Sequence, residues 1–70
     1  MSIVTDHLKK KYEDAEHRVF CREIDLRLLR CREGQMTPFA YNEYMGAAQR
    51  ALWNAENEAG MWLKTLEANL

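Results

Sequence analysis

His17 and Cys21 are the side chains of this 70-residue chain whose types and spacing come closest to metal chemistry. They are four residues apart, so on a helix the imidazole and the thiol share one face, and both groups bind zinc. A two-fold axis joining two copies would bring two such pairs into a four-ligand site. The chain lacks the CxxC and HExxH spacings that are typical of zinc proteins. We therefore expect no metal, with Cys21 packed in a core and His17 partly exposed.

Nucleophilic and acid–base chemistry also lack the residues they need. Cys31 stands between Arg30 and Arg32, and cationic neighbours of this kind are found beside reactive thiols. A catalytic cysteine also needs a positioned base, and no histidine is near Cys31 in the sequence. The carboxylates are scattered, without a poised acid–base pair, a nucleophile elbow or a phosphate loop. So short a chain can hardly wall off a pocket, and we predict a non-enzymatic protein with no catalytic residue and no cofactor.

Composition and charge narrow the classes of protein to which this chain can belong. The chain is 47% hydrophobic and 30% charged, and ten Lys and Arg against eleven Asp and Glu give a formal net charge of −1. It is too apolar for a disordered tail, and no stretch approaches the roughly 18 apolar residues of a membrane-spanning helix. A generic polyanion binder would be strongly basic. Residues 1–6 lack the basic and apolar regions of a signal peptide, which predicts a cytoplasmic protein without a membrane partner.

The two cysteines, Cys21 and Cys31, are ten residues apart. On one helix their Cα atoms would be separated by about 15 Å, whereas a disulfide tolerates at most about 7 Å. An internal disulfide is therefore excluded, and free buried thiols are typical of the cytosol. A disulfide that joins cysteines of two copies across a dimer axis remains an alternative.

Glycine and proline divide the chain into two helices. Gly34 suits the left-handed residue just past a helix end. Thr37 followed by Pro38 is typical of a helix start, with a hydroxyl N-cap and a proline whose missing N–H costs nothing. The pattern predicts one all-α domain over residues 1–70, with helix 1 at 5–33, a turn at 34–37 and helix 2 at 38–69. So short a turn predicts an antiparallel two-helix hairpin.

Helix 1 carries apolar side chains on two nearly opposite faces. The first face comprises Leu8, Tyr12, Ala15, Val19, Leu26 and Leu29. The second comprises Phe20, Ile24, Leu28 and Cys31, with Cys21 at its edge. One partner helix cannot cover both faces. Burying one Phe, Ile or Leu side chain stabilises a fold by roughly 1.5–3 kcal/mol, so leaving the second face in water costs several kcal/mol of stability. We therefore predict a homodimer, a four-helix bundle of two hairpins whose interface is Phe20, Ile24, Leu28 and Cys31.

Helix 2 likewise carries apolar side chains outside its main apolar stripe. Its main apolar stripe comprises Tyr41, Tyr44, Met45, Ala48, Ala51, Leu52, Ala55, Ala59, Trp62, Leu63, Leu66 and Leu70. Away from it, Phe39, Gly46, Trp53 and Gly60 recur every seven residues. The glycines are either merely tolerated or form notches beside Trp53. Because Trp and Arg dominate binding hot spots, we assign Phe39, Trp53, Arg22 and Arg30 to partner binding, although the aromatic pair would also suit the dimer interface.

Arginines in the C-terminal half of helix 1 support an alternative function. Residues 18–32 hold five Arg against Glu23 and Asp25, and such a half-helix could lie along a phosphate backbone. A solvated face with acid–base pairs such as Asp14 and Arg18 explains the same residues, and the arginines form no single stripe. Association with nucleic acid is therefore the less favoured prediction.

A leaderless helical hairpin of this size, with Gly34 and Thr37-Pro38 marking its turn and spare apolar faces on both helices, resembles small phage-encoded inhibitors, among them the anti-quorum-sensing proteins. The resemblance covers the whole chain in architecture and size, and it transfers no functional residue to a numbered position. It implies a stoichiometric binder that occludes a host transcription regulator or a motor ATPase.

Overall fold

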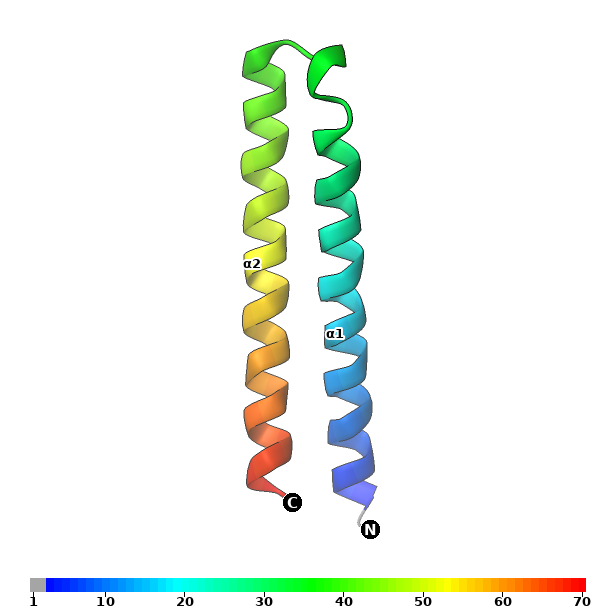
Figure 1. Ribbon diagram of the computed structural model, residues 1–70. Coiled ribbons are helices and arrows are strands. Elements are labelled where there is room, and N and C mark those ends of the chain that lie inside the picture. Colours follow the sequence, from blue (N-terminus) through cyan, green and yellow to red (C-terminus); the bar gives the residue numbers. More distant parts are fainter. Residues whose placement is uncertain (1–2) are drawn as a thin grey trace.

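The computed structural model describes residues 3–70, which form two long helices lying side by side and antiparallel (Figure 1). Helix α1 spans Ile3–Arg30, a short 3₁₀ helix η1 spans Glu33–Gln35, and α2 spans Pro38–Ala68. The described part of the chain contains no strand. The predicted all-α hairpin is confirmed. It is a rod of 53 × 14 × 11 Å.

The chain leaves α1 earlier than the sequence predicts. The Arg32 N–H donates to the Leu29 carbonyl, and the Gln35 N–H donates to the Arg32 carbonyl. These three-residue spacings tighten the chain into a 3₁₀ turn, so α1 ends at Arg30 rather than at residue 33. The left-handed conformation predicted for Gly34 is wrong, because no described glycine has a positive φ and a 3₁₀ turn uses right-handed angles.

Helix α2 begins as the sequence predicts. Thr37 is extended, with φ −65° and ψ 150°, and its hydroxyl accepts a hydrogen bond from the Ala40 N–H at 3.2 Å. Pro38 occupies the first helical turn, where its fixed φ is already helical. The cap satisfies a backbone donor that would otherwise lack a partner.

A narrow seam joins the two helices. Its buried side chains are small or aliphatic: Leu8, Ala15, Leu26, Ala55 and Ala59. All six residues of the first predicted face of helix 1 are buried or half-buried, and so is the main stripe of helix 2 except Tyr44 and Leu70. Tyr44 lies at the edge of the seam and Leu70 lies beyond the end of α2. Alanines let the backbones approach closely, which narrows the rod and thins its core.

Candidate functional site

Outside its buried seam, α1 and the turn after it carry an apolar surface, which we call the back face of α1: Phe20, Ile24, Leu28 and Cys31. Phe20 and Leu28 stand at the two edges of this surface, where each also lines a groove shared with α2. Phe20 is 58% exposed and Leu28 is 57% exposed, and Ile24 and Cys31 are exposed as well. The 3.6-residue helical period turns these residues away from buried Leu26. The predicted interface residues therefore share one surface, and the hairpin itself does not cover it.

Helix α2 has a corresponding surface, the outer face of α2, formed by Phe39, Gly46, Trp53 and Gly60. Trp53 is 65% exposed and Phe39 is 76% exposed. Beyond the neighbouring backbone of its own helix, a methyl group added at Gly60 would meet no atom within 4 Å, and one added at Gly46 would meet only the flexible Arg50 guanidinium at 3.4 Å. No packing within the hairpin therefore requires a glycine at either position.

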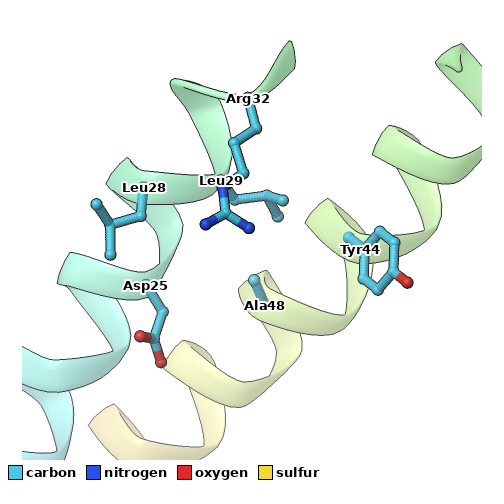
Figure 2. Close-up of a pocket in the computed structure, with 6 residues that line it drawn as sticks. All are labelled: Asp25, Leu28, Leu29, Arg32, Tyr44 and Ala48. Carbon is cyan, nitrogen blue, oxygen red and sulfur yellow. The ribbon is translucent and has the colours of Figure 1, made fainter. Parts of the chain in front are cut away.

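Shallow grooves run between the helices where their side chains leave gaps. One of about 310 Å³ lies near the turn and is lined by Asp25, Leu28, Leu29, Arg32, Tyr44 and Ala48. Figure 2 shows the Arg32 side chain reaching back along α1 toward Leu29, with Ala48 of α2 pointing into the gap. A second groove of about 360 Å³ is lined by Glu16, Val19, Phe20, Glu23, Glu56 and Ala59. Both grooves are open to solvent, so they suit a macromolecular surface better than an enclosed small molecule.

The predicted partner-binding arginines are not brought to the outer face of α2. Arg22 lies on α1, where its guanidinium donates to Asp25 at 3.3 Å, and it lines a third groove of about 290 Å³ with Ala51 and Ala55. Arg30 is exposed at the C-terminal end of α1. The structure therefore splits the predicted set, with Phe39 and Trp53 on one helix and the arginines on the other.

An ion pair between the helices was not predicted by the sequence. Arg18 of α1 donates to Glu58 of α2 at 2.6 Å, although Asp14 is the acid four residues away in sequence. Local spacing cannot reveal such a contact, because it depends on the register of the two helices. Arg18 and Arg22 both hold carboxylate partners, which weakens the basic surface that a phosphate backbone would need.

The cysteines lie on the surface. Both Cys21 and Cys31 are exposed, so the prediction of a buried, core-packed thiol is wrong: Cys21 lies on a side of α1 that α2 does not cover. Its sulfur is 3.7 Å from Nε2 of His17, the contact that their spacing predicts. Within residues 3–70, no group of three or more His, Cys, Asp or Glu side chains is placed to hold a metal ion.

No protein-family model, curated protein or solved structure matches this chain. Over residues 3–70, neither long helix has an apolar segment of the length and hydropathy needed to cross a bilayer.

Proposed function

We propose that this chain is a small non-enzymatic interaction protein. It forms a homodimer of two hairpins through the back face of α1, and it uses the outer face of α2 to bind a second protein and block it sterically. The observation that carries this proposal is the amount of apolar surface that the hairpin leaves in water on both helices.

The exposed area has the size expected of a chain that needs partners. The chain exposes 5551 Å², whereas a compact monomer of 8.3 kDa would expose about 4,600 Å². The surplus, about 950 Å², exceeds the roughly 800 Å² that one partner contributes to a stable protein interface. It includes Phe20 and Leu28 on α1 and Trp53 on α2, so an assembly that covers these residues stabilises the fold as well.

The outer face of α2 has the character of a binding hot spot. Exposed Trp53 offers a large apolar ring with one N–H donor, the side-chain type most enriched in binding energy. Gly46 and Gly60 lie seven residues to either side, about 10 Å along the helix, and Gly60 offers a partner an exposed stretch of backbone without a side chain. Such a face fits a folded protein surface. By the resemblance to phage inhibitors, the partner is a host transcription regulator or an ATPase.

The test of the partner face compares Trp53→Ala with Tyr44→Ala. Both remove an exposed aromatic side chain from α2, but Tyr44 belongs to the groove between the helices. Each variant is used to capture proteins from a bacterial extract, and the captured protein is then purified and its activity titrated with each variant. We expect Trp53→Ala to lose capture and inhibition and Tyr44→Ala to keep both.

Two results would overturn the proposal. If Trp53→Ala captures and inhibits as well as the unmodified chain, the binding face is wrongly placed. If sedimentation equilibrium finds a folded monomer at micromolar concentration, the back face of α1 needs no second copy. The salt dependence of binding distinguishes a protein partner from nucleic acid. Binding to phosphates weakens steeply as ionic strength rises, whereas binding through an apolar interface at Trp53 responds little.

A further inference from the structure

One groove between the helices carries charge of a single sign. It is the groove of about 360 Å³, which we call the acidic groove, and it is lined by three apolar residues and three glutamates: Glu16, Val19, Phe20, Glu23, Glu56 and Ala59. Ala59 is buried and Val19 is half-buried, whereas the glutamates are exposed. Glu16 and Glu23 belong to α1 and Glu56 belongs to α2. The groove therefore has an apolar floor with carboxylates from both helices around it.

The three glutamates are not neutralised by cations of the hairpin. Within residues 3–70, none of them forms a salt bridge. Glu16 accepts a hydrogen bond from the hydroxyl of Tyr12, which is a neutral donor and leaves the negative charge in place. Arg27 is four residues from Glu23, but the described side chains of these two residues do not pair. Three uncompensated carboxylates around one groove attract a cationic ligand.

The other two grooves described above carry charges of both signs. Arg18 and Arg22 line one of them together with Glu58. Arg18 pairs with Glu58, and Arg22 donates to Asp25. The groove near the turn is lined by Asp25 and Arg32. The imbalance thus belongs to the acidic groove and does not follow from the formal net charge of −1 of the whole chain.

The spacing of the carboxylates suits a helix. Glu16 and Glu23 are seven residues apart, which is about 10 Å along α1, and basic residues repeated every seven positions on a partner helix have the same interval. A helix laid along the groove brings basic side chains on one edge to Glu16 and Glu23, and those on its other edge to Glu56. An apolar residue between the two edges then covers Phe20, which is 58% exposed.

We infer that the acidic groove binds an amphipathic helix of another protein, in which Lys or Arg flank an apolar stripe. This site goes beyond the proposed function and does not rest on it. Trp53 is not among the residues that line the groove, so the site is separate from the outer face of α2. Of the predicted dimer interface, only Phe20 lines the groove.

A synthetic peptide tests the site. The probe is a fluorescent peptide of about three heptads, with Leu at the a and d positions and Lys at the e and g positions. Fluorescence anisotropy measures its binding to the full chain, and we expect the binding to weaken as salt is added, because salt screens the ion pairs. A peptide with Glu in place of Lys should not bind. A peptide with Ala in place of Leu should bind more weakly, because it lacks the side chains that cover Phe20.

Two combined variants locate the binding. The groove variant removes all three charges of the acidic groove: Glu16→Gln, Glu23→Gln and Glu56→Gln. It should raise the dissociation constant of the Lys peptide about tenfold. The matched control changes the net charge by the same amount at exposed positions that line none of the three grooves: Asp14→Asn, Glu33→Gln and Glu43→Gln. It should leave the affinity nearly unchanged, and circular dichroism checks that both variants fold.

Several results would overturn the inference. Equal weakening by the groove variant and the matched control would mean that binding follows net charge alone. Equal binding of the Leu and Ala peptides would mean that the apolar floor is not used. Loss of peptide binding in Trp53→Ala would place the peptide on the outer face of α2, and the proposed function would stand without this second site. A groove variant that loses self-association would show that a second copy, and not another protein, occupies the groove.

Discussion

The guanidinium of Arg18 on α1 lies 2.6 Å from Oε1 of Glu58 on α2, joining residues that are forty positions apart in the chain. The contact marks the height at which the two antiparallel helices meet. Both side chains are about half exposed, at 48% and 46%, so water and salt screen the attraction.

A double-mutant cycle on Arg18→Ala and Glu58→Ala should therefore give a small coupling, about 0.2–1 kcal/mol in the free energy of unfolding. Urea denaturation followed by circular dichroism measures it. The coupling should shrink further in molar salt. A coupling well above this range would mean that the pair is buried in solution, for instance within an assembly.

Ala15 is the most buried residue of the seam, at 1% exposed. Ala15→Leu should destabilise the fold by about 1–3 kcal/mol, because the larger side chain forces the helices apart. Ala47→Leu on the exposed side of α2 is the matched control and should change stability by less than about 0.5 kcal/mol. Thermal unfolding of both variants checks the prediction, and equal effects would contradict the observed register.

Thr37 caps α2 through its hydroxyl. Thr37→Ala should lower the free energy of unfolding by about 1 kcal/mol, because the Ala40 N–H loses its acceptor. Thr65 is the internal control: its hydroxyl donates to the Met61 carbonyl within the same helix, and Thr65→Ala should be neutral or slightly stabilising, since alanine is the better helix former. Urea denaturation ranks the two variants, and a more stable Thr37→Ala would show that the hydroxyl does not act as the cap.

Tyr12 should give the fold a dependence on alkaline pH. Its hydroxyl donates to the Glu16 carboxylate, and this hydrogen bond, reinforced by the charges of Glu16 and Glu67, raises the pKa of Tyr12 above its ordinary value of 10.0. The folded state thus favours the protonated phenol. The stabilisation is complete below the ordinary pKa and is lost as the pH rises through the higher pKa of the folded state.

Absorbance titration of the phenolate checks this in a Tyr41→Phe, Tyr44→Phe background, where Tyr12 is the one remaining tyrosine. Adding Glu16→Ala should return the pKa toward its ordinary value and weaken the alkaline loss of stability. An unchanged titration curve would contradict the hydrogen bond.

Substitution of Gly60 should change the stability of the fold and the binding of a partner in opposite directions. Gly60→Ala should stabilise α2 by up to about 1 kcal/mol, since a methyl group there meets no atom within 4 Å beyond the neighbouring backbone of its own helix. In the proposed binding face the same methyl group would stand where a partner approaches the bare backbone at Gly60, so it should weaken capture of the partner. Thermal unfolding and the capture assay, run on one preparation, decide the matter, and capture that rises together with stability would count against a binding role for Gly60.

The sequence predicts the helices well because its signals are local. Thr37-Pro38 marks the start of α2 through a cap whose donor is three residues away, and the apolar period selects the face of α1 that carries Leu8 and Leu26. The end of α1 was predicted less well, because a glycine is compatible with both a left-handed cap and a 3₁₀ turn. Here backbone hydrogen bonds across residues 29–35 select the turn.

The surfaces were predicted in part. The exposure of Phe20, Leu28 and Trp53 agrees with the expectation that a lone hairpin cannot bury them. The sequence assigns Arg22 and Trp53 to one partner-binding set, but Arg22 lines a groove between the helices with Ala51 and Ala55, and Trp53 is not part of that groove. Contacts of this kind depend on helix register, and so did the contact between Arg18 and Glu58.

The Cα trace of the hairpin is 53 Å long but only 14 × 11 Å across, and this shape governs how it will behave in nuclear magnetic resonance. The N–H bonds of both helices run nearly along the long axis, and only end-over-end rotation reorients them. Amide signals throughout α1 and α2 of a single, undimerised hairpin should therefore relax at one slow, uniform rate, as if its 8.3 kDa belonged to a heavier globule.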